Sequence, residues 1–569
     1  MVKVQSTIIN TDVLVIGGGS AASRATLEST KAGAKTTLVT KGAYGFSGTS
    51  CFHVAEAAGF SASGYDEPTD SPDQHLVDIM EAALGTCSEE LAKIVAYEAP
   101  RQVPFLESLG LEFGRYKGGY LVTRGCFASK RRSIKLKGHG VPIVGVLKNE
   151  ILRRGDVQII EHCMATELIV EENTCRGAFI HLNNGSICEI RAKSTILGTG
   201  GAGQLFSESL NPPDVTGDGY AMGYRAGAEL VNMEFMQAGF GIAEPAKTIF
   251  SLWLWNLSPR IFDEDGIEFL AEYIPEGLTL NDCISAKNGL NGNGHYPFSS
   301  RDSSKYLEIA VKKRSNSGKA VYADLRHIKD ITTDELEKIN PNAARMWPIT
   351  KAWMIKKGAD IDNEPVRIVC YAHAFNGGLL IDRNAETTIK HLYAVGEVSG
   401  GYHGADRLGG NMFSSGQVFG EIAGKNAAQN ALVMNNDTSA PREEKSNTFT
   451  GEKGIESVVR IREKLQRLST DELLIIRNRQ GLQHYLKEIK CLTDELKKCS
   501  ANTFEEEIYI KETENLMITG YLMVSSALER NESRGSHYRE DYSELDDSLR
   551  EVIIHKIENS IPIMKRIVL

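Results

Sequence analysis

A short apolar segment that runs into a glycine-rich turn lies near the start of the chain and constrains its fold more than any other feature. Residues 12–16 read Asp-Val-Leu-Val-Ile, and residues 17–22 read Gly-Gly-Gly-Ser-Ala-Ala. Residues 24–31 have helical composition, and 36–40 form a second apolar segment. This order predicts a strand, a tight turn, a helix and a second strand, which is the β-turn-α-β unit of a parallel sheet.

The spacing of the small residues in this turn, GxGxxA, is typical of a phosphate-binding turn. Gly17 permits the tight turn, Gly19 lets a pyrophosphate approach the backbone, and Ala22 lets the helix pack close to the strand. Ser20 and Ala21 lie at the helix N-terminus, which offers N–H groups and the positive end of the helix dipole. A glycine turn without a ligand is the alternative. Because the flanking strands and helix all fit, we expect these five residues to contact a dinucleotide.

Further strands that run into glycines indicate that the nucleotide site is completed later in the chain. Residues 157–181 contain short alternating strand segments, and 194–203 form a strand followed by Gly-Thr-Gly-Gly-Ala-Gly. Residues 216–222 open another helix, and 391–397 repeat the strand-into-glycine pattern. We therefore expect one dinucleotide fold that is assembled from both sides of an insertion at roughly 240–365.

Charge and cysteine spacing exclude several classes of protein. With 64 Lys and Arg against 74 Asp and Glu, the net charge is −10, whereas a nucleic-acid binder usually needs a basic face. No apolar run reaches the roughly 18 residues that span a bilayer, and residues 1–11 are too polar for a signal peptide. The ten cysteines form no CxxC pair, so we expect inert thiols and no metal site. Because no apolar run is long enough to span a bilayer, we expect a cytoplasmic protein that reaches a membrane only through a partner.

The character of the sequence changes near residue 430. At about 150 residues per domain, 569 residues predict three to four domains. Residues 435–453 are polar and are interpreted as a linker, and 455–530 carry long helical patterns that predict a helical bundle packed on the body. We expect 550–568 to be helical too.

Two later runs, together with the glycine motifs, resemble the sequence of a known family. Residues 402–411 read Tyr-His-Gly-Ala-Asp-Arg-Leu-Gly-Gly-Asn, and 531–542 read Asn-Glu-Ser-Arg-Gly-Ser-His-Tyr-Arg-Glu-Asp-Tyr. With the GxGxxA turn and the Thr-Gly-Asp-Gly at 216–219, they resemble the flavoprotein subunit of succinate dehydrogenase and fumarate reductase. That superfamily also includes L-aspartate oxidase and the adenylylsulfate reductase α subunit.

The resemblance implies an α/β fold with four parts. A Rossmann-like FAD-binding domain takes up two segments, 1–240 and 366–432, an α+β capping domain is inserted at 241–365, and a helical domain with a C-terminal tail follows at 433–569. FAD rather than NAD fills the dinucleotide site. The implied activity is that of an FAD-dependent oxidoreductase of electron transport, which exchanges a hydride between the flavin and a small carboxylate substrate.

The same resemblance assigns catalytic roles to three residues. Arg407 is similar to the arginine that binds a substrate carboxylate, a task for which its planar fork is suited. His373 corresponds to a histidine that hydrogen-bonds a substrate carboxylate. Arg301, in a Ser-Arg-Asp element, corresponds to the proton donor. Since an arginine with a pKa above ~12 is a poor acid in water, it can serve only by passing a proton through neighbouring carboxylates in a dry site.

Contacts to FAD are also expected by resemblance, from residues of both segments. Glu397 is similar to an acid that contacts ribityl or ribose hydroxyls, Asp218 would hold the adenosine side, and the helix that opens at Asn411 would face the flavin carbonyl end. The remaining expected contacts are Thr40, Lys41, Ser47, Gly48, Thr49, Ala165, Thr199, Gly200, Arg407 and Ser414.

Several positions depart from the family pattern. Membrane-complex members carry a histidine covalently bonded to FAD where this chain has Gly48, and His53 is not equivalent, so we expect non-covalent FAD and a flavin potential that favours substrate reduction. Thr40-Lys41 stands where other dinucleotide sites carry an acid, but this family has Ser-Lys there.

The second group of departures lies at the capping domain. The HPTG and GEGG motifs of members that use fumarate or succinate are absent, which removes a His, a Thr and a Glu that clamp the second carboxylate. Trp253 and Trp255 stand there instead and indicate either a larger, more apolar ligand or a capping-domain core. The acid-containing proton relay that precedes Arg301 in the family is also displaced, because Glu268 and Glu272 are nearby in sequence but out of step by one residue.

Alternative functions follow from these departures. One is a superfamily member with another substrate, either adenylylsulfate-reductase-like or amino-acid-oxidase-like, and another is a non-catalytic electron-transfer flavoprotein. Since the chain has no cysteine cluster, electrons must pass through a partner protein, a diffusible donor or oxygen. An iron–sulfur subunit that docks near the helical domain is the favoured hypothesis.

Overall fold

The computed structural model describes residues 7–289, 294–436, 442 and 451–569, so much of the expected linker lies outside the described residues. Its central sheet has the strand order β8 (Val157–Ile160), β2 (Thr36–Val39), β1 (Thr7–Ile16), β11 (Ile187–Leu197), β10 (Thr174–Leu182), β9 (Cys163–Glu171), and β19 (Leu392–Ala394) also pairs with β11. The strands from β8 to β11 in this order, and β19, are parallel, whereas β9, β10 and β11 form an antiparallel meander.

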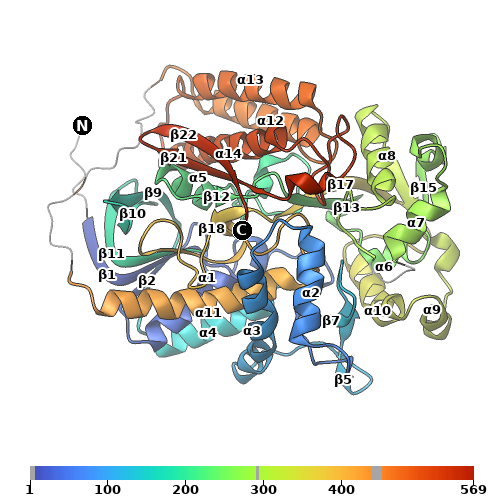
Figure 1. The fold of residues 1–569 in the computed structure, drawn as a ribbon, viewed down its shortest axis with the longest axis horizontal. Coiled ribbons are helices and arrows are strands. Elements are labelled where there is room, and N and C mark those ends of the chain that lie inside the picture. The colour runs from blue at the N-terminus through green and yellow to red at the C-terminus, as the bar shows by residue number, and fades with distance from the viewer. Residues whose placement is uncertain (1–6, 290–293, 437–441, 443–450) are drawn as a thin grey trace.

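Helices cover both faces of this sheet. In Figure 1, α1 (Ser20–Lys31), α4 (Val141–Arg154) and α11 (Asn411–Leu432) lie below it, and α5 (Asp218–Arg225) lies above it. The last four residues of β1 are fully buried apolar side chains, as a parallel strand covered on both faces requires. Gly17 ends the strand with φ of 114°, and a Cβ there would lie 2.2 Å from the Gly198 oxygen, so only glycine fits. The expected β-turn-α-β unit is present.

A group of two helices and several short strands lies beside the central sheet. It contains α2 (Pro72–Ala83), α3 (Glu89–Ser108), the hairpin of β4 (Arg115–Tyr116) and β5 (Gly119–Tyr120), and a sheet of order β3 (Ala57–Ser61), β7 (Arg131–Lys137), β6 (Val122–Arg124). The buried Arg132 of β7 binds Asp70 and Asp78, which ties β7 to α2. In Figure 1, this group lies between the central sheet and the inserted residues.

The inserted residues form a mixed unit, which is at the right of Figure 1. Its sheet has the order β14 (Thr248–Ile249), β13 (Met236–Glu244), β17 (Val366–Phe375), β16 (Val321–Asp324), β15 (Arg260–Asp263). Its helices are α6 (Leu252–Trp255), α7 (Leu280–Asn288), α8 (Lys305–Asn316), α9 (Thr333–Ile339) and α10 (Pro341–Lys356). Because β13 enters this unit from the body and β17 returns to it, the pair is the connection between the two.

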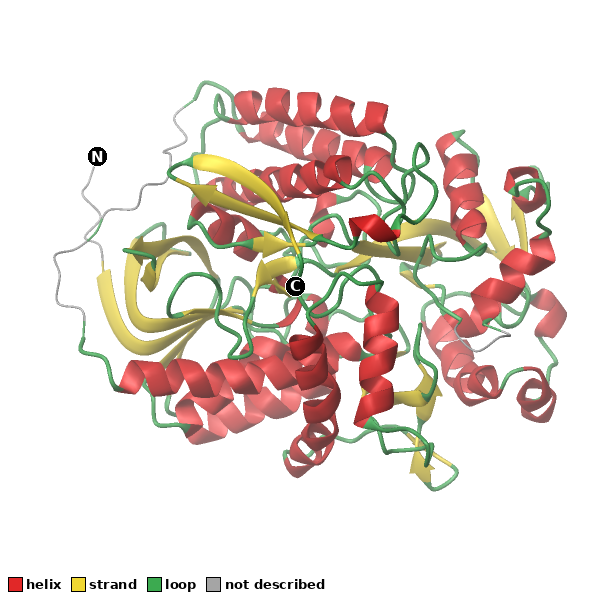
Figure 2. Cartoon of the chain, viewed as in Figure 1, coloured by secondary structure: helices red, strands yellow, loops and turns green. Residues whose placement is uncertain are grey.

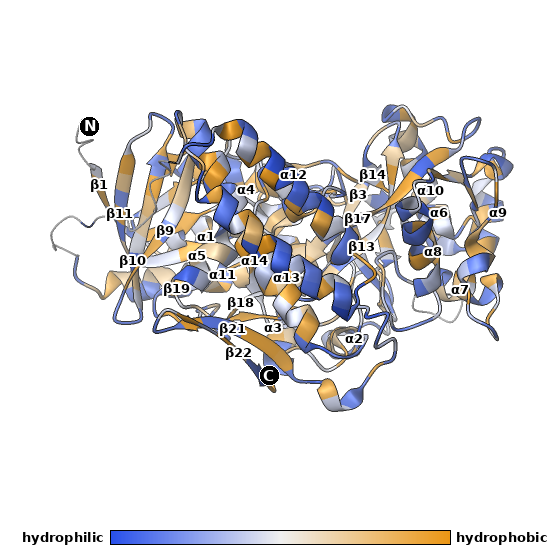
Figure 3. Cartoon of the chain, turned by 90° about the horizontal axis from the view of Figure 1, so that it is seen from above, coloured by the Kyte–Doolittle hydropathy of each residue, from blue (hydrophilic) through white to orange (hydrophobic). Residues whose placement is uncertain are grey.

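Three long helices form a layer above the body (Figure 2). They are α12 (Ile455–Glu472), α13 (Arg479–Leu496) and α14 (Phe504–Glu529). Figure 3 shows apolar and polar residues alternating around them, as one-sided burial requires. The α/β fold with an inserted α+β unit and a C-terminal helical layer is therefore confirmed. Among the described helices, none has the length and apolar character that a bilayer span needs.

The expected helix at 550–568 is wrong. This segment is a hairpin of β21 (Val552–Glu558) and β22 (Ile561–Ile567), and it extends a sheet of β20 (Ser399–Gly400), β18 (Gly378–Leu380) and β12 (Leu230–Val231). Isoleucine recurs along both strands, and such β-branched side chains pack well on a pleated sheet, although they also occur in buried helices. Asn559 and Ser560 both have positive φ, which is the geometry of a two-residue hairpin turn.

Candidate functional site

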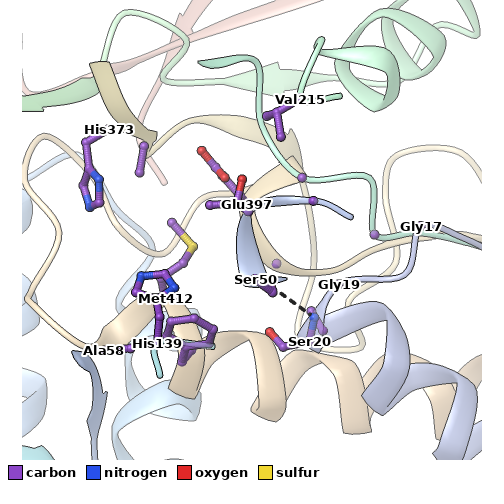
Figure 4. A pocket seen from close by; sticks show the side chains of 18 of the residues that line it. Gly17, Gly19, Ser20, Ser50, Ala58, His139, Val215, His373, Glu397 and Met412 are labelled. Atoms are coloured by element: carbon purple, nitrogen blue, oxygen red, sulfur yellow. Dashed lines mark hydrogen bonds between the residues drawn. The ribbon is translucent and has the colours of Figure 1, made fainter. Parts of the chain in front are cut away.

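A cavity of about 330 Å³ extends from the glycine turns of the body to the inserted unit. Figure 4 shows its two ends, with Gly17 and Gly19 at one, His139 and His373 at the other, and Glu397 between them. We call these the glycine end and the histidine end. Elements far apart in sequence meet here, because the parallel strands of the sheet end at this edge.

The glycine end presents backbone rather than side chains. Gly19 is the N-cap residue of α1 and makes no side-chain capping bond, while the N–H of Ser20 reaches only the Ser50 Oγ, at 3.3 Å. A Cβ on Gly19 would have Ser50 Oγ at 3.4 Å as its nearest contact. The first turn of α1 therefore faces open space with its N–H groups, which suits the pyrophosphate of a dinucleotide.

A half-buried lysine lies next to this turn. Lys41 Nζ contacts Thr216 Oγ1 at 2.7 Å, Asp218 Oδ2 at 2.9 Å and Glu512 Oε1 at 2.7 Å. Burial opposes the charge of Lys41, but the two carboxylates raise its pKa above the ordinary lysine value. Glu512 belongs to α14 and also pairs with Arg462 of α12, so the helical layer is anchored at the nucleotide site.

The middle of the cavity contains a carboxyl group and a polar loop. Glu397 accepts a hydrogen bond from the Phe375 N–H at 2.9 Å, and burial raises its pKa to about 7. In the loop, the Gly48 N–H donates to Asp214 Oδ2 at 2.8 Å, and Thr49 Oγ1 donates to Asn211 Oδ1 at 2.9 Å.

The histidine end is rich in buried cationic and neutral donor groups. Burial, and then the charge of Arg407, lowers the pKa of His373 to about 3, so this imidazole is neutral. Arg407 donates from Nη1 to the Leu408 oxygen at 3.1 Å, and its Nε has no hydrogen-bond partner within the described residues. Tyr296 packs edge-on against His373, with 5.9 Å between ring centroids, and its Oη lacks a partner in the same part of the chain.

Arg301 does not line the cavity. Its Nε and Nη2 lie 3.0 and 2.9 Å from Asp406 Oδ2, and Nη2 also donates to the Ala82 oxygen at 2.9 Å. Ser299 donates to the same Asp406 oxygen at 2.7 Å. Arg301 thus reaches the histidine end through Asp406, the residue before Arg407.

The two tryptophans of the inserted unit have different places. Trp253 lines the cavity, whereas Trp255 is fully buried between Phe240 and Phe250. Glu268 is exposed on the surface beside Arg260 and is not part of the cavity lining. One tryptophan thus shapes the ligand space and the other is core.

The Asn-Glu-Ser-Arg-Gly-Ser-His run holds these parts together. The Gly535 oxygen accepts the Ser300 N–H at 2.7 Å, and Ser536 Oγ donates to the Ala405 oxygen at 2.8 Å. The buried Glu532 binds both Arg530 and Arg534, at 2.9 and 2.8 Å. The run therefore fixes the segment of Arg301 against the loop that ends in Arg407.

We expect Glu532→Ala to lower the free energy of unfolding by about 3–5 kcal/mol, because it leaves two buried guanidinium groups without this partner. Chemical denaturation of the FAD-loaded protein measures the change. Glu463→Ala removes an exposed ion pair to Arg467, 3.9 Å long, and should cost about 1 kcal/mol or less. Equal losses in the two variants would show that the buried cluster carries no special stability.

Most residues expected from the sequence line the cavity. They are Gly17, Gly19, Ser20, Ala21, Thr40, Lys41, Ser47, Gly48, Thr49, Ala165, Thr199, Gly200, Asp218, His373, Glu397 and Arg407. Ala22 is buried in α1 under Gly198, Asn411 Oδ1 contacts His75 Nε2 at 3.0 Å, and Ser414 bonds back to its own helix. These three are not among the lining residues, although the first turn of α11 is present through Met412 and Phe413.

The sequence reasoning missed several lining residues. They are chiefly Ser50, Glu56, Arg124, Cys126, Lys135, His139, Asp214 and Tyr296. Ser50 and Asp214 had a usable signal, because Ser50 follows Thr49 directly and Asp214 lies close to Asp218 in the sequence. Lys135 had none, since alternate residues of a strand face opposite ways and the sequence did not say which face of β7 meets the cavity.

Comparisons with known proteins show which family the chain resembles over nearly its whole length. Residues 12–413 match a family model described as an FAD binding domain, and residues 462–560 match one described as the C-terminal part of fumarate reductase flavoproteins. The chain is 32% identical to a fumarate reductase (CoM/CoB) subunit of Methanothermobacter marburgensis, over 95% of this chain and 96% of that protein. It is 28% identical to L-aspartate oxidase of Nostoc sp., over 93% and 90%.

Solved structures share the fold. A variant of the E. coli quinol fumarate reductase superimposes with a TM-score of 0.80 at 23% identity, covering 98% of this chain and 97% of that one. Adenylylsulfate reductase from Archaeoglobus fulgidus has a TM-score of 0.71 at 20% identity, covering 100% and 97%.

Proposed function

Since this chain belongs to the fumarate reductase and succinate dehydrogenase flavoprotein family and is an FAD-dependent oxidoreductase, we propose that it reduces a small unsaturated dicarboxylate, with fumarate as the first candidate. The observation that supports this most is one continuous cavity, with a backbone-lined phosphate turn at one end and the Arg407–His373 pair at the other. Bound FAD supplies the hydride chemistry, and the protein binds and orients.

The residues that line the cavity fit FAD. Open backbone at Gly19 and the first turn of α1 suit the pyrophosphate, and the buried Thr199 Oγ1 lacks a protein partner among the described residues. Glu397 and Asp218 are carboxyl groups placed to accept hydroxyl or amino donors. Because position 48 is a glycine, it offers no side chain for a covalent bond to the cofactor, and we propose that FAD is held non-covalently.

Arg407 and His373 are proposed to hold one substrate carboxylate. Arg407 is buried without an ion pair within the described residues, so an anion in the cavity would compensate its charge. Its fork can make two parallel hydrogen bonds to a carboxylate. His373 is neutral because its pKa is low, so it donates a hydrogen bond without adding charge.

Arg301 and Asp406, neither of which is among the residues that line the cavity, are proposed to deliver the proton together from beside Arg407. Burial raises the pKa of Asp406, and its Oδ1 has no hydrogen-bond partner among the described residues, so this carboxyl group can carry a proton beside Arg301. That pairing meets the requirement for a neighbouring carboxylate, because a guanidinium with a pKa above ~12 does not release a proton readily without one. Tyr296, which lines the cavity, is the competing donor.

We expect Arg301→Gln to lower turnover roughly a thousandfold while FAD binding and flavin reduction by dithionite stay normal, since a positioned proton donor contributes about 10²–10⁴ in rate. The measurement is anaerobic turnover with fumarate. Tyr296→Phe, which removes one hydroxyl from the cavity, is the matched variant and should retain most activity. The opposite ranking of the two variants would assign the proton to Tyr296.

The function is tested by mixing the dithionite-reduced protein with fumarate without oxygen. Return of the oxidised flavin spectrum is the expected result, and bleaching of the oxidised protein by succinate should be slower. Bleaching by L-aspartate or by sulfite with AMP, without any response to fumarate, would replace fumarate by the amino-acid-oxidase-like or adenylylsulfate-reductase-like alternative. No response to any of these compounds would leave an electron-transfer flavoprotein.

The electron donor is proposed to be a separate iron–sulfur protein. The ten cysteines show no CxxC spacing, and all are free in the structure. The relative in Methanothermobacter marburgensis is itself named as one subunit of a fumarate reductase, which supports a multi-chain assembly here as well. The native protein should therefore copurify with a second chain that contains iron and acid-labile sulfide.

A further inference from the structure

A second buried cation lines the cavity in addition to Arg407, and the charges of both act on the thiol of Cys126, which lines the same cavity. Lys135 is 6% exposed, lies in β7 and lines the cavity. Its Nζ lies 3.5 Å from Ser133 Oγ and 4.8 Å from the ring centroid of Trp253. In the described part of the chain it forms no ion pair within 4 Å, and the carboxylate of Glu56 acts on its charge only from farther away. Lys41, the other lysine of this cavity, contrasts with it, because two carboxylates contact its ammonium group.

A buried ammonium group without a carboxylate contact is costly. Burial lowers the pKa of Lys135 to about 8, against the smaller opposing effects of Glu56 and Cys126. At neutral pH it therefore still carries its charge. An anion bound in the cavity would compensate that charge, as Asp218 and Glu512 do for Lys41.

Hydrogen bonds to Glu56 hold the side chains around Lys135 in place, and they do not involve its ammonium group. Trp253 Nε1, Ser251 Oγ and Thr350 Oγ1 all donate to Glu56 Oε1, at 2.6, 3.2 and 3.0 Å. Three side chains of the inserted unit thus donate hydrogen bonds to one oxygen of Glu56. These bonds hold the Trp253 ring next to the Lys135 ammonium group. In the run that replaces the missing capping-domain motif, Trp253 is uncharged, and Arg260 pairs with Glu268 on the surface and is not among the lining residues.

Resting on the proposed function, we infer that Lys135 binds the second carboxylate of a dicarboxylate whose first carboxylate is held by Arg407 and His373. The strand β7, and not the inserted unit, then supplies the second anchor, and the cavity selects dianions over monoanions.

The test compares fumarate with monomethyl fumarate, which lacks one charge. We expect Lys135→Met to raise KM for fumarate roughly 30- to 100-fold, the range of a lost charge-assisted hydrogen bond, with kcat changed much less. KM for the monoester should not change. Lys137→Met, an exposed lysine of the same strand, should match the wild type, and Lys135→Arg should restore most of the affinity.

The pH profile gives a second readout. In the protein without substrate, the Lys135 ammonium group loses its proton as pH rises through about 8. We therefore expect kcat/KM for fumarate to fall above that pH in the wild type. The fall should be absent in Lys135→Arg, which stays charged. If kcat/KM of Lys135→Arg falls above pH 8 as it does in the wild type, the titration belongs to another group, and this part of the inference is overturned.

Binding measurements separate this inference from the proposed function. If the wild type reduces no dicarboxylate, the proposed function fails, and the shift of the flavin spectrum by malonate and by acetate still tests Lys135. Weaker malonate binding in Lys135→Met, with acetate binding and FAD content unchanged, supports the second anchor. Equal malonate affinity in both proteins, equal losses for both anions, or loss of FAD from the variant overturns it.

Discussion

Replacement of Arg407 by methionine should lower kcat/KM roughly a thousandfold, or about 4 kcal/mol of transition-state stabilisation, with FAD still bound. Arg407 is buried at the histidine end without an ion pair among the described residues, so a substrate carboxylate would be its counter-ion. Methionine fills similar space but removes both the charge and the planar fork that orients the carboxylate. Steady-state kinetics with fumarate and the flavin absorbance of the purified variant measure the two effects.

Two further variants make the Arg407 experiment specific. Arg407→Lys keeps the charge but loses the two-pronged geometry, and it should fall between the wild type and Arg407→Met. Arg326→Met removes an arginine whose ion pair to Asp324 is local and remote from the cavity lining, and it should leave kcat/KM unchanged. If Arg407→Met keeps more than about a tenth of the activity, the carboxylate is held elsewhere.

Replacement of Gly19 by valine should yield a folded but colourless protein. The backbone of Gly19 is extended, with φ of −71°, and a Cβ there meets only Ser50 Oγ at 3.4 Å, so the apoprotein tolerates the side chain. The added methyl groups would occupy the space where a pyrophosphate approaches the first turn of α1. Even a clash of about 3 kcal/mol lowers affinity by more than a hundredfold, at about 1.4 kcal/mol per tenfold change.

The Gly19 experiment measures FAD after reconstitution and in the supernatant after acid precipitation. Release of the yellow cofactor from the acid-treated wild type also tests the proposal of non-covalent FAD. Gly145→Val is the matched control, because Gly145 lies within α4 and a Cβ there meets nothing within 4 Å. Full FAD content in Gly19→Val would exclude the α1 turn as the pyrophosphate site.

The parts of the fold that are local in sequence could be predicted. The glycine turn after β1 depends on neighbours within about ten residues, and Gly17 must be glycine for a reason visible in the turn itself, its φ of 114°. The same is true of the apolar periodicity that predicted α12 to α14. The resemblance then extended this local information to Arg407, His373 and Glu397, which do line one cavity.

The segment at 550–568 shows where local information fails. Its isoleucines and valines are compatible with either a buried helix or a strand, and β21 is stabilised by pairing with β12, more than 300 residues away. Likewise, Asn411 and Ser414 were expected to touch FAD because their helix begins at the cavity. The rotation of α11 turns their side chains toward His75 and the helix backbone instead.

The sequence by itself thus determined the nucleotide fold, since short motifs encode turns and helix termini directly, and its resemblance to a known family indicated FAD and residues at both ends of the ligand cavity. Only the tertiary structure decided that Arg301 meets Asp406 outside the cavity and that Lys135 faces into it. The physical reason is that the direction of a side chain depends on which face of its strand or loop is covered, and that face is set by packing between distant segments.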